Sequence, residues 1–484
     1  MDAVTEWFGA WFGAGHYEFA RQMLQRGVAA IYVVAFLSTL AQFPALLGEH
    51  GLLPVPRYLA RGGAAGMPTL FRLHYSDRML RAVCVVGAVV AAALVAGLPQ
   101  LGPPWLPLVA FLLLWILYLS IVKVGQTFYG FGWEMLLCEA GFLVAFLGSN
   151  EVAPPILVIL LVRWLVFRLE FGAGMIKMRG DRSWRDLTAL YYHHETQPMP
   201  NPLSRFAHLL PKSVHRMEVL GNHVAQLVVP FLLFEPQPVA SIAAAVVILT
   251  QLWLVLTGNF AWLNVLTIVL AFGAVSDDAI HAIIPAMPAT TSYSSDPAPL
   301  SWVAIVLIAT ALMVVLSWPP LRNLFSRRQL MNASFTRFSL VNAYGAFGSV
   351  TQERYEVVIE GSTAERPLRE EDWRPYEFKG KPGDVRRIPG QFAPYHLRLD
   401  WLMWFLALGS PDSGWFRALL GKLLVADRAT LRLLRHDPFD GEPPTWIRAR
   451  VYLYRFASRS ERRETGQWWM REETGELVAP SRLR

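Results

Sequence analysis

The sequence predicts a polytopic α-helical membrane protein with about eight or nine spans, followed by a soluble α+β domain. Two observations lead to this class. The 484 residues are 54% hydrophobic and only 17% charged, and their mean hydropathy of +0.33 exceeds that of ordinary soluble proteins. Apolar runs long enough to cross a bilayer recur as far as residue 318, whereas strand-like alternation replaces them beyond residue 330.

Residues 1–27 predict an amphipathic helix that lies in the membrane interface. Aromatic residues such as Trp7 and Phe12 are interleaved with charged ones such as Glu18 and Arg21, a pattern typical of surface-lying helices. We expect no cleavable signal peptide in this segment. A multi-pass transmembrane domain is then expected over 28–325. Its predicted spans are 28–47, 80–98, 105–122, 133–149, 152–170, 219–236, 239–257, 260–276 and 301–318.

Four charged residues inside two of these spans predict buried ion pairs. Glu134 and Glu139 precede a turn near Glu151, and Arg163 and Arg168 follow it. Equal sequence distances from the turn place Glu139 level with Arg163, and Glu134 level with Arg168, in an antiparallel hairpin. Because five residues turn a helix by about 500°, the two pairs cannot share one stripe. We expect the pairs to stabilise the helices, with a role in a polar functional cavity as the alternative.

The segment 171–218 after the fifth span is dense in charged and aromatic side chains, and it predicts an ordered polar loop. Such groups are costly to desolvate near a bilayer unless they pair with one another. We expect the loop to hydrogen-bond to Asn222 and Asn259 and to form one polar patch at a membrane face. The candidate binding residues are Arg168, Lys177, Arg179, Asp181, Trp184, Arg185, Asp186, Tyr192, His193, Glu195, Gln197, Asn201, Asn222, Asn259 and Asp277.

Lys177 is the one candidate for a catalytic base. A partly desolvated lysine beside other cations can lose its proton, although a snorkelling or salt-bridged lysine is the simpler interpretation. The sequence holds no serine-nucleophile elbow and no H-E-x-x-H motif. The adjacent His193 and His194 point about 100° apart on a helix. We therefore expect no metal and no cofactor, and the absence of a complete catalytic constellation favours a protein that is not an enzyme.

The segment 330–484 predicts a soluble α+β domain with its own core. Residues 355–360 and 448–455 alternate with the period of a strand, whereas 399–408 and 415–434 are helical candidates. Basic and acidic residues are nearly balanced in this segment. We therefore expect a solvated surface and no nucleic-acid partner.

The distribution of basic residues predicts the topology. No Lys or Arg occurs between Arg216 and Arg322. With nine spans, the basic loop and the C-terminal domain lie on one side of the membrane, which the positive-inside rule identifies as the cytoplasm. The expected location is the plasma membrane if the source is bacterial and the endoplasmic reticulum membrane if it is eukaryotic.

Residues 171–202 read FGAGMIKMRGDRSWRDLTALYYHHETQPMPNP and resemble the signature of the lipase maturation factor family, with His194 in place of an aromatic residue. Thr257-Gly258-Asn259 and Asn342-Ala343-Tyr344-Gly345-Ala346-Phe347 extend the match. The resemblance implies a membrane-embedded maturation or folding factor. Its animal members lie in the endoplasmic reticulum membrane and assist the folding or assembly of secreted homodimeric lipases. The partners that it implies are client proteins such as secreted lipases, and membrane lipid.

Two departures from the family pattern limit what carries over. Cysteines flank the Lys-Pro-Gly-Asp turn in the family, where this chain has Gly380 and Pro389, so a disulfide or redox role does not transfer. The C-terminal domain of the family is luminal, whereas the charge distribution of this chain favours the cytoplasm.

The membrane part is also similar to the vitamin K-dependent carboxylases, in which a lysine leaves a membrane helix in a comparable stretch. This second resemblance implies an alternative function. It is a membrane enzyme that acts on a quinone, with Lys177 as the base and with Arg179, Asp181, Arg185 and Glu195 as positioning groups.

Overall fold

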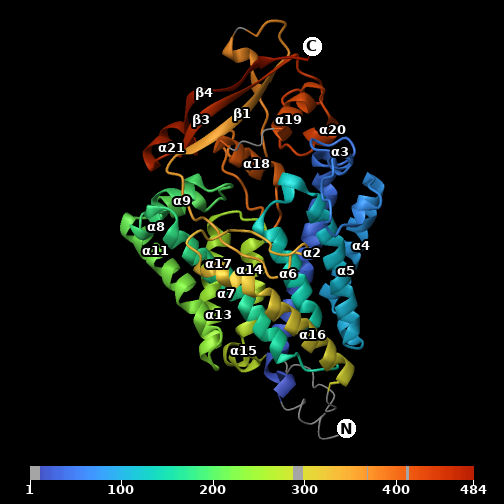
Figure 1. Ribbon diagram of the computed structural model, residues 1–484. Helices are drawn as coiled ribbons and strands as arrows, with labels where there is room; N and C mark the ends of the chain where they lie inside the picture. Colours follow the sequence, from blue (N-terminus) through green and yellow to red (C-terminus); the bar gives the residue numbers. More distant parts are fainter. Residues whose placement is uncertain (1–10, 287–297, 368, 410–413, 484) are drawn as a thin grey trace.

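Long apolar runs form a bundle of upright helices, and a small β-sheet lies across one end of it (Figure 1). This computed structural model describes residues 11–286, 298–367, 369–409 and 414–483. Within these residues, five helices are long and apolar enough to cross a membrane, or six if one bent pair is counted as a single span. The five are Gly15–Leu46, Asp77–Ala96, Trp105–Val124, Val239–Thr257 and Leu300–Phe325.

Length and apolarity alone do not yield the eight or nine spans expected from the sequence. The helix α6 (Gly132–Val144) has only 13 residues, and α7 (Ile156–Arg179) carries several charged residues. The other helices belong to the bundle or to the loop between α7 and α11, and some of them are the membrane-crossing candidates named above. They are α2 (Glu18–Leu46), α3 (Val55–Ala60), α4 (Asp77–Ala96), α5 (Trp105–Val124), α8 (Arg182–Arg185), α9 (Leu190–Thr196), α10 (Ser204–His208), α11 (Lys212–Leu227), α12 (Val229–Leu232), α13 (Val239–Thr257), α14 (Leu263–Ala271), α15 (Asp277–Ile283), α16 (Leu300–Leu316) and α17 (Trp318–Phe325).

The N-terminal segment differs from the expected interfacial helix over 1–27. Residues 1–10 lie outside the described part of the chain. Residues 18–27 form the first turns of α2, and Arg21, Leu24 and Gln25 are buried there. Burial of the charged group is possible because Arg21 pairs with Glu18 and donates a hydrogen bond to Asn150 Oδ1 at 2.8 Å. Two of the charges that predicted the polar face of a surface helix, Glu18 and Arg21, therefore point into the bundle.

The helix in the predicted span 260–276 is short, and a bend follows it directly. The helices α14 and α15 meet at an angle of 106°. Asp277 begins α15, and its carboxylate accepts hydrogen bonds from the backbone N–H groups of Glu18 and Phe19 at 3.1 and 2.9 Å. N–H groups in the first turn of a helix have no acceptor within that helix, and a negative charge is favourable at a helix N-terminus. The bend thus places Asp277 as a cap for the first long helix.

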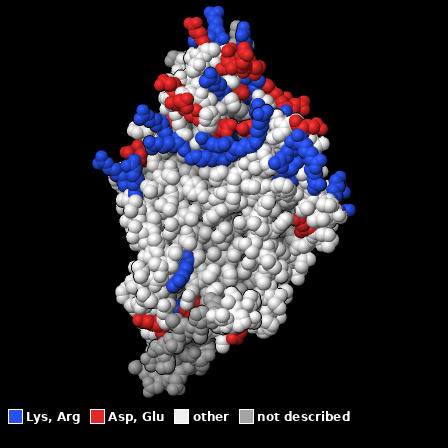
Figure 2. Space-filling view, turned by 180° about the vertical axis from the view of Figure 1, so that it is seen from behind, with Lys and Arg blue, Asp and Glu red and all other residues white. Residues whose placement is uncertain are grey.

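Charge is arranged in layers along the bundle. On the face that Figure 2 shows, a broad, almost uncharged band covers the helices and is bordered by a row of Lys and Arg side chains where the bundle meets the C-terminal domain. Such a band has the character expected of a surface in contact with hydrocarbon, with basic side chains at its edge.

The C-terminal domain is built on a four-stranded antiparallel sheet in the order β2-β1-β3-β4. The strand β1 (Arg354–Ser362) pairs with β3 (Trp446–Phe456) along its whole length, from Arg354 opposite Tyr454 to Ser362 opposite Trp446. The remaining elements flank this pair. They are β2 (Arg374–Pro375), α18 (Arg398–Ala407), α19 (Gly414–Leu424), α20 (Arg428–Leu431), α21 (Arg459–Thr465) and β4 (Trp469–Ser481).

Both predicted strands and the first predicted helix of the domain are present. The second predicted helix, 415–434, is interrupted after Leu424, because Ala426 adopts a φ of +49° that a continuing helix does not allow. Asp427 then accepts a hydrogen bond from the Thr430 N–H and starts the short helix α20.

The core of the C-terminal domain is mostly shared with the bundle. One hydrophobic cluster runs from bundle residues such as Tyr32 and Phe128 to Trp401, Trp415 and Ile447 of the domain. A smaller separate cluster lies on the other side of the sheet and contains Val358, Tyr452, Tyr454, Phe456 and Trp469. The domain is therefore packed onto the bundle through its main core, in place of the independent core expected from the sequence.

Candidate functional site

The two carboxylates of α6 hold the later part of the chain against the bundle. Glu139 is fully buried and pairs with Arg168 of α7. It also accepts hydrogen bonds from the Asn342 N and Nδ2 atoms at 2.9 Å and from the Tyr344 hydroxyl at 2.8 Å. Asn342 and Tyr344 belong to the linker segment, which we define as residues 326–353 between α17 and β1. One buried ion pair thus anchors this segment inside the bundle.

Glu134 attaches the C-terminal domain to the bundle in the same way. Its carboxylate pairs with Arg398 of α18 at 2.5 Å, lies 3.4 Å from His396 Nδ1, and accepts a hydrogen bond from the Tyr118 hydroxyl. Arg398 also donates to the carbonyl oxygen of Phe128 at 2.9 Å. A buried charge needs several partners to be stable, and here the partners come from α5 and from residues 396–398.

The observed pairing corrects the pairs predicted from sequence spacing. Glu139 pairs with Arg168 instead of Arg163, because rotation about α7 turns only one of the two arginines towards α6. Arg163 donates to the carbonyl oxygens of Gly273 and Leu233 at 3.0 and 3.1 Å. Both carbonyls lie where a helix ends or bends, and a cation is favourable at such a site.

The loop between α7 and α11 folds back against the end of α13. That helix stops at Thr257, which leaves its last carbonyl groups without helical partners. The Thr257 carbonyl accepts hydrogen bonds from Gln197 Nε2 at 2.8 Å and from the Ser204 hydroxyl at 2.7 Å. Asn201 Nδ2 donates to the Leu256 carbonyl at 2.9 Å. The amides of the loop thus complete the hydrogen bonding of a membrane helix.

Asn259 joins the loop and the C-terminal domain. Its Oδ1 atom accepts hydrogen bonds from the N–H groups of Phe392 and Ala393 at 2.7 and 2.9 Å. Its Nδ2 atom donates to the Gly390 carbonyl at 3.0 Å, and its own N–H donates to the Met199 carbonyl at 3.2 Å. The contact expected at Asn259 is therefore present, and it involves a third segment that the sequence did not suggest.

The sheet holds the same loop from the other side. Arg354 at the start of β1 is buried beside Glu356 and donates to the carbonyls of Glu195 and Pro198 at 2.9 and 3.1 Å. The Phe456 N–H donates to the Glu195 carboxylate at 2.6 Å. Burial raises the pKa of Glu195, although that hydrogen bond acts in the opposite direction.

Lys177 lies on the last turn of α7. The sequence had placed it just past the membrane exit, in the predicted loop 171–218. Its Nζ atom donates to Asn222 Oδ1 at 3.0 Å and to Gln226 Oε1 at 2.9 Å, and it lies 4.6 Å from the centre of the Trp184 ring. The contact expected at Asn222 is thus present. Gln226 continues the chain of hydrogen bonds to Glu170 at 3.2 Å.

That chain of polar side chains runs on through the bundle. Gln251 of α13 donates to Glu170 Oε1 at 2.6 Å, and Asn264 of α14 donates to Gln251 Oε1 at 2.8 Å. All three side chains are buried. Polar groups at this depth need such partners, and here they link four helices.

The other candidate residues of the loop separate into a packed group and an exposed group. Arg179 donates to Gln329 Oε1 at 2.6 Å, and the Trp184 indole N–H donates to the Phe347 carbonyl at 2.8 Å, so both hold the linker segment. Tyr192 packs beside Trp184. Arg185 and Asp186 are exposed.

Asp181 starts the short helix α8. It accepts hydrogen bonds from the N–H groups of Ser183 at 2.8 Å and Val350 at 3.3 Å. Burial tends to raise the pKa of Asp181, but these hydrogen bonds hold it below the ordinary value.

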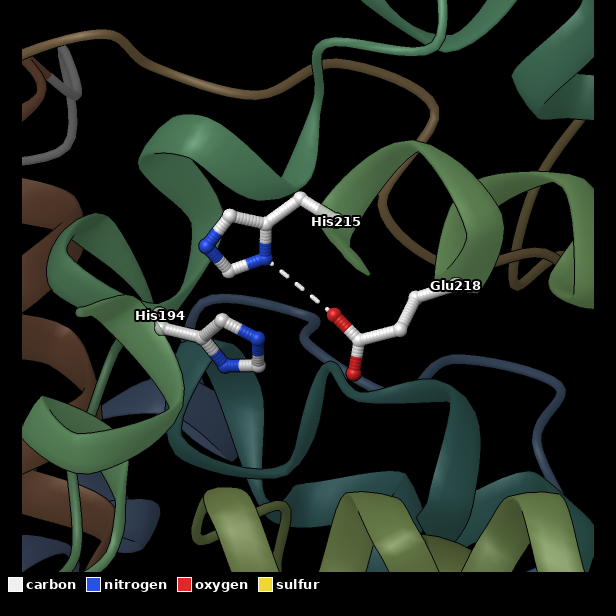
Figure 3. A group of neighbouring side chains, drawn as sticks. All are labelled: His194, His215 and Glu218. Carbon is white, nitrogen blue, oxygen red and sulfur yellow. Dashed lines mark hydrogen bonds and ion pairs between the residues drawn. The ribbon is translucent and has the colours of Figure 1, made fainter. Parts of the chain in front are cut away.

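Three histidines of the loop are held as neutral groups. Burial lowers the pKa of His193 and of His208 to about 4, and it lowers that of His194 as well. His194 lies beside His215 and Glu218 of α11, and the three side chains point towards one another (Figure 3). Within the described residues, they are the ones whose donor atoms come close enough to hold a metal ion.

An aromatic cavity of about 270 Å³ lies where the bundle, the linker segment and α18 meet. Its walls include the rings of Phe131, Trp133, Phe260 and Trp401. The indole N–H of Trp401 is buried and has no hydrogen-bond partner among the described residues. Its aromatic walls make the cavity a mainly apolar site.

Comparison with known protein families finds two matches that follow one another along the chain. Residues 19–282 match the lipase maturation factor transmembrane domain, and residues 340–479 match the lipase maturation factor C-terminal domain. The chain belongs to the lipase maturation factor family. The apolar helices agree with this result and identify the chain as a membrane protein.

Three relatives show how completely the chain resembles the family. Lipase maturation factor 1 of Bos taurus is 38% identical over 509 residues, which cover 96% of this chain and 90% of that protein. Lipase maturation factor 1 of Homo sapiens is 37% identical, with 97% and 89% covered. Lipase maturation factor 2 of Homo sapiens is 30% identical, with 93% and 81% covered. No solved structure matches the chain. These relatives support the lipase maturation factor resemblance and lend no support to the carboxylase alternative.

Several residues that build this site were not predicted from the sequence. Arg398, Glu170, Gln226 and Gln251 were not among the candidates. Each is a polar residue beside or inside an apolar segment, which was the available signal. Their partners lie on other helices, so spacing along the chain could not reveal them.

Proposed function

We propose that this chain is a membrane-embedded maturation factor that assists the folding or assembly of lipase-like client proteins. The observation that carries the proposal is the extent of the family match, which covers 96% of the chain against a named lipase maturation factor. The matched region includes the loop, the linker segment and the C-terminal domain. These three parts are tied together by buried hydrogen bonds into one ordered surface at the end of the bundle.

The aromatic cavity is the part of this surface that suits a partly folded client. Aromatic side chains in a concave site contribute much of the binding energy in protein complexes. Trp404 and Phe405 of α18 line the cavity and remain partly exposed. A client segment with apolar side chains would bury them.

Membrane lipid is the second partner that we propose. Arg205 of the loop lines a surface cavity of about 480 Å³ together with Arg459, Arg462 and Arg463 of α21. Clusters of basic side chains beside a hydrocarbon-facing surface attract anionic headgroups. This contact would hold the C-terminal domain close to the membrane surface.

We propose that the chain crosses the membrane nine times rather than eight. The helix α2 starts beside α15, at the end of the bundle opposite the sheet (Figure 1). A chain that begins at one end and places its C-terminal domain at the other crosses an odd number of times. The short or charged helices α6 and α7, the pair α11 and α12, and the bent pair α14 and α15 would supply the four crossings beyond the five apolar helices. The membrane would be the plasma membrane in a bacterium and the endoplasmic reticulum membrane in a eukaryote.

The maturation role is tested in cells of the source organism that lack the gene. The expected result is that secreted lipases are still made but that their specific activity, measured per mass of lipase protein, falls several-fold. Full-length chain should restore it, whereas Trp404→Ala should restore it less well than the control Val109→Ala, which alters a surface-exposed residue of α5. Normal specific activity of all secreted lipases in the deletion strain would contradict the proposal.

A further inference from the structure

Three side chains from two separate helices converge beside the loop (Figure 3). His194 lies on α9, whereas His215 and Glu218 lie one turn apart on α11. Each offers one ligand atom, and these atoms all lie within 4.8 Å of one another. His215 Nδ1 is 3.1 Å from Glu218 Oε2. Because the fold brings His194 to the other two, no metal-binding motif appears along the sequence.

The hydrogen bonds of His215 leave a contradiction that a cation would resolve. Its Nε2 atom lies 3.2 Å from the carbonyl oxygen of His208. A carbonyl oxygen only accepts, so Nε2 carries the hydrogen. A neutral His215 then presents the lone pair of Nδ1 to the carboxylate of Glu218. Two acceptors at this distance repel each other unless a proton or a metal ion lies between them.

His194 supplies a second, independent observation. Its side chain is only 2% exposed, and neither ring nitrogen has a hydrogen-bond partner among the described residues. A buried polar group without a partner costs roughly 1–3 kcal/mol. A second proton on His215 would satisfy the contact with Glu218 but would leave His194 without a partner. One cation shared by all three side chains would satisfy the contact with Glu218 and would give one ring nitrogen of His194 a partner.

We propose that His194, His215 and Glu218 bind one transition-metal ion of the Zn²⁺ type. Two imidazole nitrogens and one carboxylate oxygen are a common ligand set for Zn²⁺, with a fourth position left for solvent. The bond from His215 to the His208 carbonyl is also the kind of contact that orients metal-binding histidines. Ligand atoms around tetrahedral Zn²⁺ lie roughly 3.4 Å apart, so small side-chain rotations would close the site.

A metal ion at this place would join α9 to α11 and so fix the loop against the bundle. This role is independent of the proposed maturation function, because it concerns the attachment of the loop and not the choice of client. The site uses side chains other than those of Gln197 and Asn201, which bond to the end of α13, so it would add a second attachment of the loop.

The test uses the full-length chain purified in mild detergent, freed of metal with a chelator and titrated with Zn²⁺. Elemental analysis after gel filtration should find one Zn²⁺ per chain, and Co²⁺ in its place should give the strong visible absorption of a tetrahedral site. His194→Phe and Glu218→Gln should each weaken Zn²⁺ binding roughly 100-fold or more, since each removes a ligand. The control His74→Gln alters an exposed histidine and should bind as the wild type does.

Wild-type chain that retains no Zn²⁺, or Zn²⁺ that all four proteins retain equally as an adventitious ion only, would overturn the proposal. Glu218 is partly exposed, so Glu218→Gln decides the matter if His194→Phe does not fold.

Discussion

At the scale of single residues, buried charges decide which parts of the chain meet. Glu134 and Glu139 are both fully enclosed, and each is satisfied by residues from beyond the bundle. Breaking such a pair is far more destabilising than forming it is stabilising, because the remaining charge stays buried without a partner. The two carboxylates therefore act as attachment points whose loss cannot be compensated by solvent.

Substitution of Glu139 tests this attachment. Glu139→Gln leaves Arg168 buried without a countercharge, and we expect a loss of about 3–5 kcal/mol in the free energy of unfolding. The measurement is the thermal unfolding midpoint of the purified chain in detergent. Glu151→Gln is the control, because Glu151 is an exposed acid in the turn of the same hairpin. Equal midpoints for the two variants would show that the pair does not hold the linker segment.

A second residue-scale prediction concerns pH. Burial lowers the pKa of His396 to about 4, and neighbouring Arg398 adds to the effect while Glu134 opposes it. The unfolded value is about 6.5, so the folded state holds His396 neutral. Stability is therefore complete above about pH 6.5 and falls as the pH drops towards 4, by up to about 3 kcal/mol.

The measurement is the denaturation midpoint of wild-type chain between pH 7 and pH 4. His396→Gln should lose less stability over this range than the wild type, whereas His50→Gln, which alters an exposed histidine, should behave as the wild type does. Parallel pH curves for His396→Gln and wild type would refute the assignment.

At the scale of elements, the loop is held by the open ends of its neighbours. The end of α13 offers carbonyl groups, and the loop offers amides that satisfy them. Asn259 adds the segment around residue 392. Three elements that are far apart in sequence thus share one hydrogen-bonded junction.

Removing the Asn259 side chain should loosen this junction. Asn259→Ala deletes the acceptor of two backbone N–H groups and one donor, and each lost bond to a buried group costs roughly 1–3 kcal/mol. We expect faster amide hydrogen exchange at Met199, at Asn201 and at residues 390–393. Thr250→Val is the matched control, because the Thr250 hydroxyl bonds only to carbonyls of its own helix. Unchanged exchange in Asn259→Ala would contradict this role.

Elements were easier to predict than their partners. The strands around residues 357 and 451 and the polar loop followed from period and composition, because these signals are local. The pairing of Arg168 and the continuation of α7 to Arg179 could not be predicted in this way. The rotation of a helix about its axis and the residue at which it ends both depend on packing. The His194 cluster was equally hidden, since its members meet only in the folded chain.

At the scale of the whole molecule, the shared core makes the bundle and the C-terminal domain one structural unit. The main hydrophobic cluster passes from α2 through α6 to α18 and α19 without interruption. Family matches to separate transmembrane and C-terminal regions therefore do not correspond to two independent cores.

This continuity predicts the behaviour of the isolated C-terminal segment. Residues 330–484 produced alone would expose the apolar faces of Trp401 and Trp415, which are buried in the full chain. We expect this fragment to aggregate or to unfold without a cooperative transition, as measured by circular dichroism during heating. Adding α6 and α7 in the same polypeptide should not suffice, because α2 also contributes to the cluster. A sharp transition and dispersed amide resonances for the fragment would contradict a shared core.

The link between Glu134 and Arg398 has a consequence for synthesis, because it joins residues 264 positions apart. The ribosome delivers Glu134 long before its countercharge exists. Glu134 stays in that apolar setting without its countercharge until α18 is made, so the contact forms only after residue 398 has been translated. Nascent chains that terminate before residue 398 would thus lose more than a domain, because they would carry an uncompensated acid within the helices and become substrates for membrane quality control. A protein of a maturation family would itself depend on its final segment to mature.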